Sequence, residues 1–266
     1  MAEYALGQSE EALKRLIDQA AFVGPITERM LRAAGVGPGM RVLDIGCGAG
    51  DVTFQTAELV KANGHVLGVD MAGEPIRMAW QRAKAAGLAN VTFREGTEAD
   101  LDAEAPFDCI IGRYVLIYQP NPVDFVRRLA AQLRPGGTLA LQEVDFTHPI
   151  AAIPPMAKLD RMLNEIVAIM ARTAADVGSA TRMAGIFAEA GLPAPSGFCE
   201  RTIGMEGART FFRWAASSYA VLQSRISPES DPVDVDRLVG EFLADVAAVH
   251  GCAHGPDQWC AWTIRA

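Results

Sequence analysis

The sequence has few cysteines and no long run of basic or apolar residues. Its five cysteines are odd in number and mostly far apart along 266 residues, so they do not resemble a disulfide framework. A formal charge of −8 without any Lys/Arg run argues against a protein that grips a nucleic-acid backbone. No apolar stretch approaches the roughly 18 residues of a membrane span, and the N-terminus does not resemble a secretory signal. We therefore expect a cytoplasmic protein that binds neither nucleic acid nor membrane.

The composition that is present, 50% hydrophobic and 21% charged, is that of a folded globular chain. Short apolar segments alternate with helical patterns over the first 150 residues. We expect strands at 41–45, 65–70, 91–94, 107–112 and 138–145. Helices of ten or more residues lie between most of these segments, which is typical of βαβ units and a buried parallel sheet.

The regions on either side of this pattern are mostly helical. Gly24-Pro25 is expected to separate two short helices that precede the first strand. Beyond residue 150, the apolar spacing predicts long helices and two further strands. These helices are expected at 155–176, 179–191, 208–224 and 233–249, and the strands at 197–203 and 258–264.

The segment 42–50, Val-Leu-Asp-Ile-Gly-Cys-Gly-Ala-Gly, is the most specific feature. It follows a predicted strand and opens a helix, and its glycines allow a sharp turn and close approach of a ligand to the backbone. A dinucleotide fingerprint would have a third glycine at position 51, where this chain has Asp51. An acid at a helix start is poorly placed to receive a pyrophosphate. The loop therefore disfavours a nicotinamide dehydrogenase and favours a ligand without phosphates.

A second acid, Asp70, ends the next predicted strand about twenty residues later. A carboxylate at that place can accept hydrogen bonds from both hydroxyls of a ribose. Alone it would be read as a helix cap, but paired with the glycine loop it indicates nucleoside binding.

Four motifs in order resemble the class I S-adenosylmethionine-dependent methyltransferases. They are D-I-G-C-G-A-G at 44–50, V-D at 69–70, F-D-C-I-I at 107–111 and L-R-P-G-G at 133–137. The resemblance covers roughly residues 35–146 and extends weakly to Trp262-Thr263-Ile264, which would be the antiparallel seventh strand. It implies an α/β fold, with a Rossmann-like, mostly parallel seven-stranded sheet, helices on both faces and helical cap insertions.

The resemblance also implies which residues hold S-adenosylmethionine. Asp44, Gly46, Gly48 and Gly50 would surround its methionine part, and Asp70 would bind the ribose. The other family positions fall on Met71 against the adenine, Thr97 or Glu98 at the adenine amino group, and Arg113 at the methionine amino group. Thr97 stands where the family commonly has Asp.

A methyl acceptor is expected at the carboxyl ends of the fourth and fifth strands, where open α/β sheets place ligands. His148, Glu143 and Tyr118 are the catalytic candidates, and Tyr114 and Asp145 lie beside them. Glu143 and Asp145 are two residues apart at a strand end, so either both face the crevice or one bonds the nearby loop backbone. Histidine is the residue type whose ordinary pKa suits a general base, although a capping or surface role is equally compatible with the position of His148. Tyr118 would either line the acceptor pocket or pack beneath the following helix.

Four further metal-type ligands, His250, Cys252, His254 and Cys260, do not match a standard zinc spacing, so no metal is expected.

Three regions are expected within one folded unit. Residues 1–34 would form a helical lid in which Tyr4 and Gln19 close over the cofactor, 35–150 the cofactor-binding core, and 151–266 a substrate cap interleaved with the last strands. The cap's methionines and aromatics suit a small, apolar or aromatic acceptor. The sequence leaves open a homodimer, a nucleic-acid or protein methyltransferase, and a cofactor-binding regulator without transfer activity.

Overall fold

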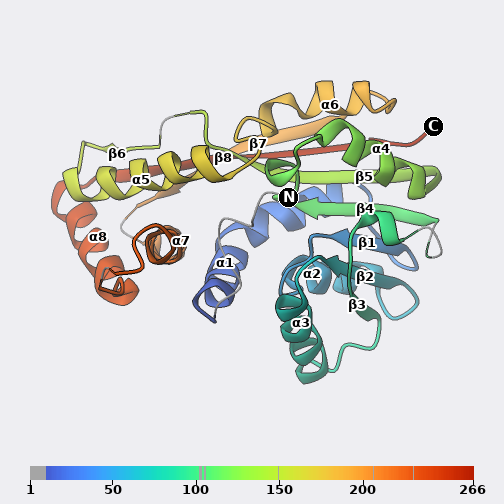
Figure 1. Cartoon of the computed structure of the whole chain (residues 1–266), viewed down its shortest axis with the longest axis horizontal. Coiled ribbons are helices and arrows are strands. Elements are labelled where there is room, and N and C mark those ends of the chain that lie inside the picture. The colour runs from blue at the N-terminus through green and yellow to red at the C-terminus, as the bar shows by residue number, and fades with distance from the viewer. Residues whose placement is uncertain (1–9, 102–103, 105, 149, 206, 230) are drawn as a thin grey trace.

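The computed structural model describes residues 10–101, 104, 106–148, 150–205, 207–229 and 231–266. The strands are β1 (Arg41–Ile45), β2 (His65–Asp70), β3 (Val91–Glu95), β4 (Phe107–Arg113), β5 (Leu133–Asp145), β6 (Ala152–Ile153), β7 (Ser196–Gly204) and β8 (Cys252–Ile264). In this part of the chain they form one eight-stranded sheet in the order β3-β2-β1-β4-β5-β8-β6, with β7 also paired to β8 (Figure 1). The first five strands are parallel, and β8 runs antiparallel to β5.

The Rossmann-like α/β fold is therefore confirmed, with one strand more than expected. The extra strand, β6, was missed because it spans two residues. The last strand is also longer than the expected 258–264. Its thirteen residues pair first with β6, at Cys252 and Ala253, and then enter the core, where they pair with β5.

Helices cover both faces of the sheet (Figure 1). The longer ones are α1 (Glu10–Ala33), α2 (Asp51–Val60), α3 (Gly73–Ala85), α4 (Pro122–Gln132), α5 (Ala157–Thr173), α6 (Met183–Glu189), α7 (Arg209–Ile226) and α8 (Val235–Val249). Apolar residues of α4 and α6 pack together on one face, and those of α1, α2 and α3 on the other. Short 3-10 turns lie at η1 (Glu98–Asp100), η2 (Leu116–Tyr118) and η3 (Ala180–Arg182).

The expected break at Gly24-Pro25 was wrong, because α1 continues through Pro25. Proline removes one backbone donor from a helix interior, yet the apolar stripe of α1 runs on either side of it. Val23, Ile26 and Met30 are all buried. Tertiary packing of that stripe outweighs the local cost of the proline.

The cap helices α5, α7 and α8 lie beyond the end of β5, near the part of β8 that pairs with β6, to one side of the core (Figure 1). They share a core of aromatic and aliphatic side chains that includes Phe211, Phe212 and Phe242. Helix α1 packs against α7, so it lies between this cap and the glycine loop. The cap is thus joined to the core through both β8 and α1.

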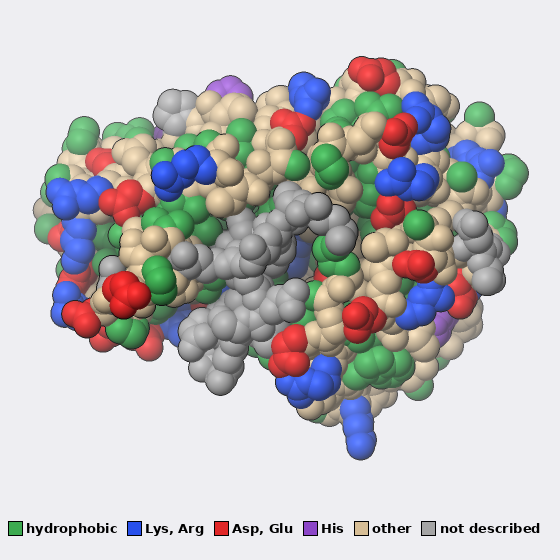
Figure 2. Space-filling view, in the orientation of Figure 1, with side chains coloured by type: hydrophobic (Ala, Val, Ile, Leu, Met, Phe, Trp, Pro, Cys, Tyr) green, Lys and Arg blue, Asp and Glu red, His purple; other side chains and the backbone are tan. Residues whose placement is uncertain are grey.

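Acidic and basic side chains are interspersed on the face seen in Figure 2. No described helix has the length and hydropathy needed to cross a membrane. Tyr4, predicted as a lid residue, lies outside the described residues.

Candidate functional site

The glycine loop joins β1 to α2, and its three glycines, Gly46, Gly48 and Gly50, all have left-handed backbone conformations. Gly46 has a φ of 69° and Gly48 a φ of 53°, which side-chain-bearing residues rarely adopt. A Cβ added at Gly46 would lie 2.6 Å from Val115, and one at Gly48 would lie 3.5 Å from Leu16. The loop is therefore closely covered by the segment after β4 and by α1.

Gly50 is required by packing within the protein. Its φ is 90°, and an added Cβ would lie only 2.8 Å from the ring of Phe54. The adjacent Asp51 forms an ion pair with Arg82, at 2.6 Å. The acid that stands in place of a third glycine is thus partly neutralised by a contact that the motif alone did not reveal.

Asp70 lies against the glycine loop. One carboxylate oxygen accepts a hydrogen bond from the backbone N–H of Gly48 at 2.9 Å, and the other from that of Ala72 at 3.0 Å. Met71 follows with 59% of its surface exposed. A carboxylate and an exposed apolar side chain side by side fit the ribose and adenine of the expected cofactor.

Asp44 is buried beneath the same loop. The Thr53 hydroxyl donates to its carboxylate at 2.6 Å. Burial raises the pKa of Asp44 to about 7, while this hydrogen bond and the charge of Arg113 act in the opposite direction. A buried carboxylate is stabilised by a cationic partner, so Asp44 fits the amino group of the expected cofactor. Thr53 was not among the predicted site residues.

The two residues predicted at the adenine amino group are both engaged in local contacts. The backbone N–H and hydroxyl of Thr97 donate to Asp100, at 2.8 and 3.0 Å. The Glu98 carboxylate pairs with Arg128 at 2.7 Å. Their contacts with a cofactor remain predictions.

Glu143 is buried and holds the segment that follows β4. Its carboxylate accepts hydrogen bonds from the backbone N–H groups of Val115 at 2.8 Å and Leu116 at 2.9 Å, and a longer one from Ile117 at 3.4 Å. Burial raises the pKa of Glu143 to about 7. These contacts match the alternative that it bonds the nearby loop backbone, and they give it a positioning role.

We expect Glu143→Gln to change how stability depends on pH. The folded pKa of about 7 exceeds the ordinary value of 4.5, so the stability associated with this carboxyl is present below pH 4.5 and is lost as pH rises through 7. Relative to the Gln variant, the wild type should lose on the order of 2 kcal/mol between pH 5 and pH 8. Urea unfolding at both pH values measures this difference, and a constant difference would contradict it.

A mostly apolar pocket lies between the segment after β4, the end of β5, and the helices α1, α5 and α7. Tyr118 and Tyr114 both line it, and their contact with a methyl acceptor stays a prediction. Its other lining residues are Arg15, Gln19, Ile117, Val144, Phe146, Ile166, Met170, Trp214, Ser218 and Leu222. Arg15 was not among the predicted residues, and Gln19 lies in this pocket together with it.

A chain of hydrogen bonds connects the two parts of the site. Arg113 donates to the hydroxyl of Thr27 at 3.2 Å, and that hydroxyl donates to Gln142 at 2.6 Å. The Gln142 amide lies 3.4 Å from Gln258, which also accepts from the hydroxyl of Tyr114 at 2.5 Å. Apart from Arg113 and Tyr114, these residues were missed, because α1, β5 and β8 bring them together from distant parts of the sequence.

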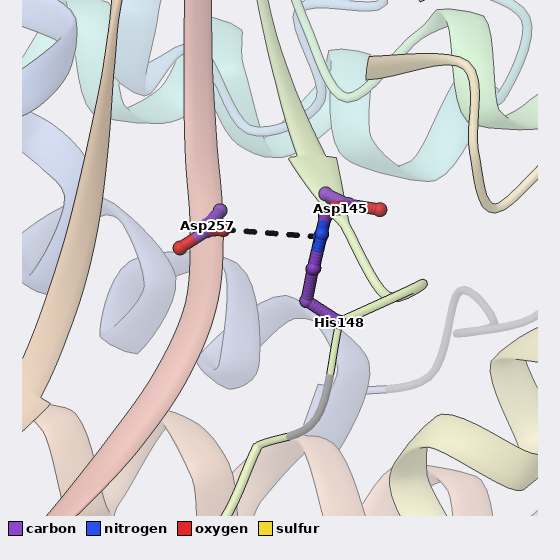
Figure 3. A group of neighbouring side chains, drawn as sticks. All are labelled: Asp145, His148 and Asp257. Atoms are coloured by element: carbon purple, nitrogen blue, oxygen red, sulfur yellow. Dashed lines mark hydrogen bonds and ion pairs between the residues drawn. The ribbon is translucent and has the colours of Figure 1, made fainter. Parts of the chain in front are cut away.

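His148 lies beside Asp145 and Asp257, between β5 and β8 (Figure 3). Its Nδ1 is 2.5 Å from Asp145 and 4.0 Å from Asp257, which also pairs with Arg201. None of these four residues is among those that line the pocket. Side chains alternate between faces along a strand, so Asp145 and Glu143 point away from Val144 and Phe146, which face the pocket. Asp145 and Glu143 therefore share one face of β5, and it is not the face that lines this pocket.

The His250, Cys252, His254 and Cys260 cluster does not appear as a group of converging ligands among the described residues. The possible metal ligands that do converge in the described part of the chain are Asp145, His148 and Asp257. His250 instead ends α8 with a left-handed backbone.

Comparison with known proteins gives a consistent result. A family model described as a methyltransferase domain matches residues 37–191. Aklanonic acid methyltransferase DauC from Streptomyces sp. (strain C5) is 35% identical over 152 residues, covering 55% of this chain and 64% of that protein. An arsenite methyltransferase from Aquipseudomonas alcaligenes is 38% identical over 114 residues, or 40% of this chain and 33% of that protein. The chain thus matches less than two thirds of each relative's length.

Among solved structures, the YcgJ protein from Bacillus subtilis aligns with a TM-score of 0.60 and 19% identity. The alignment covers 90% of this chain and 97% of that one. At this level of identity the similarity concerns the fold, including the region that contains the cap helices.

Proposed function

The chain belongs to the class I S-adenosylmethionine-dependent methyltransferases, and on that premise we propose that it methylates a small, largely apolar or aromatic molecule. The observation that carries the proposal is the juxtaposition of two sites. Val115 contacts the glycine loop at Gly46, while Ile117 and Tyr118, a few residues further on, line the apolar pocket. The pocket therefore lies beside the loop that would hold the methyl donor.

The cofactor, when bound, supplies a methyl group attached to a sulfonium sulfur, and this sulfur is the group that a nucleophilic acceptor displaces. The protein's own task is to hold and align the two molecules, and this alignment can lower the activation free energy by several kcal/mol. Asp44 would hold the amino group, Gly46 and Gly48 would allow close approach of the backbone, and Asp70 would bind the ribose. Tyr114 and Tyr118 would contact the acceptor.

Several observations favour a small molecule over a macromolecule. The pocket is lined mainly by aliphatic and aromatic side chains, which suits a ligand of that character. The net charge is −8, and the face in Figure 2 has basic and acidic groups interspersed without a continuous basic stripe. The two relatives described above are named for aklanonic acid and arsenite, both small acceptors.

Binding and turnover of the cofactor together test this proposal. We expect S-adenosylhomocysteine to raise the melting temperature and S-adenosylmethionine to be consumed with a small aromatic acceptor present. No thermal shift at millimolar ligand would contradict the proposal. Tight binding without turnover on any acceptor would favour a regulatory protein, and salt-sensitive binding to RNA or DNA would favour a nucleic-acid substrate.

We expect cofactor affinity to depend on pH through Asp44. Its pKa of about 7 means that the carboxylate is mostly protonated at pH 6 and mostly ionised at pH 8. A cationic amino group binds the ionised form, so S-adenosylhomocysteine should bind about tenfold more tightly at pH 8 than at pH 6. Calorimetric titration at both pH values measures this ratio. Asp44→Asn should abolish the pH dependence and weaken binding, whereas Asp51→Asn should retain the dependence.

A further inference from the structure

Arg15 is a buried positive charge at the acceptor pocket. It lies on α1, is 1% exposed, and is one of the residues that line the pocket. One of its guanidinium nitrogens donates to Gln19 at 2.7 Å, which orients the side chain beside a second polar pocket residue. Arginine keeps its charge at any physiological pH and has five donors, so it can bind an oxygen acceptor in addition to the groups that it already contacts.

The remaining pocket lining offers no carboxylate and no histidine among the described residues. The Glu143 carboxylate accepts hydrogen bonds from backbone N–H groups, and His148 pairs with Asp145 and is not among the lining residues. Tyr114 donates its hydroxyl to Gln258, and burial raises its pKa further above the ordinary value of 10. The described lining thus supplies a cation and hydrogen-bond donors, and no group suited to take a proton from a neutral hydroxyl at pH 7.

We propose that Arg15 binds an anionic oxygen of the methyl acceptor, so that the substrate class is small apolar or aromatic acids, such as carboxylic acids or acidic enols. This inference rests on the proposed function. In a water-poor pocket a guanidinium stabilises the ionised acid. The ionised oxygen then forms the new bond to the methyl carbon while the electron pair of the broken carbon–sulfur bond remains on sulfur. The negative charge of the acid and the positive charge of the sulfonium sulfur cancel, and no proton has to be removed.

The size of the pocket defines the conditions for a test. It has about 30 Å³ of space, room for about two water molecules, so its walls must separate to admit an aromatic acid. Arg15 and Gln19 on α1 form one wall, and Trp214, Ser218 and Leu222 on α7 form another. Because α1 also contacts Gly48, binding of acceptors is best measured with the cofactor product already bound.

The test compares acids with their uncharged amides. Calorimetry with protein saturated in S-adenosylhomocysteine measures binding of benzoate, 2-naphthoate, benzamide and 2-naphthamide. We expect wild type to bind at least one acid at least tenfold more tightly than its amide. Arg15→Met, which removes the charge at similar volume, should abolish this preference, and Arg15→Lys should retain part of it. Arg213→Met is the matched control, because Arg213 pairs with Asp18 and Asp236 near α1 without lining the pocket, and it should leave the preference unchanged.

The outcomes separate this inference from the proposed function. A thermal shift with S-adenosylhomocysteine, combined with no acid preference in wild type, would overturn the role of Arg15 and leave the methyltransferase proposal standing. Retention of the preference in Arg15→Met would show that Arg15 has only a structural role. The wild-type comparison needs no variant, so it decides the question even if Arg15→Met fails to fold. Absence of the thermal shift itself would count against the proposed function.

Discussion

Asp70→Ala is expected to abolish the rise in melting temperature that S-adenosylhomocysteine produces in the wild type. The carboxylate is the proposed acceptor for the ribose hydroxyls, and it also holds the glycine loop through the N–H of Gly48. Its removal therefore eliminates direct contacts and the loop geometry together. We expect affinity to fall at least a hundredfold, in line with the loss of two charge-assisted hydrogen bonds of about 1.5–3 kcal/mol each. Thermal shift and calorimetry measure the loss.

Glu74→Ala provides the matched control. Glu74 is an acid four residues later, at the start of α3, and its contact is a surface ion pair with Arg77. Such pairs contribute little to stability, so this variant should bind S-adenosylhomocysteine as the wild type does. If Asp70→Ala retained a full thermal shift, Asp70 would not be the ribose ligand.

Phe212→Ala is expected to cause the largest loss of stability. Phe212 is fully buried in the core shared by the cap helices and contacts the rings of Phe211 and Phe242. Removing a buried phenyl ring costs about 3–5 kcal/mol, because the transfer energy is lost and a cavity remains. Urea unfolding followed by fluorescence and circular dichroism measures the change. Ile226→Ala on the same helix removes a 45% exposed side chain and should cost much less.

The same experiment tests whether cap and core form one folded unit. β8 belongs to the central sheet through β5 and continues into the cap through β6, and α1 packs against α7. A perturbation in the cap should therefore shift a single cooperative transition of the whole chain. Two separated transitions in Phe212→Ala would instead show that the cap unfolds independently.

The parts of the site that could be predicted from sequence are local. Gly46 and Gly48 turn the chain within one loop, and Asp70 ends the neighbouring parallel strand. The carboxyl ends of adjacent parallel strands meet at one edge, so a motif on each strand is enough to bring these residues together. The strands of the core were predicted on the same basis, from short apolar segments between helices.

The role of Glu143 shows where this reasoning ends. The sequence placed it near the end of a strand, which the structure confirms. Its direction depended on the alternation of side chains along β5 and on the path of residues 115–117, which turn back to meet it. A count of alternating positions does not tell which face a strand turns toward a pocket.

The sequence by itself determined the family, the fold and the loop expected to hold the cofactor, because each depends on short segments with fixed local geometry. Only the tertiary structure decided what surrounds the acceptor. Arg15 meets Tyr114 and Trp214 there because α1 continues through Pro25 and packs between core and cap. Tyr114 and Gln258 are 144 residues apart and meet because β8 returns to the sheet. Contacts of this kind arise from packing of apolar faces over the whole molecule, and no local pattern encodes which of those faces meet.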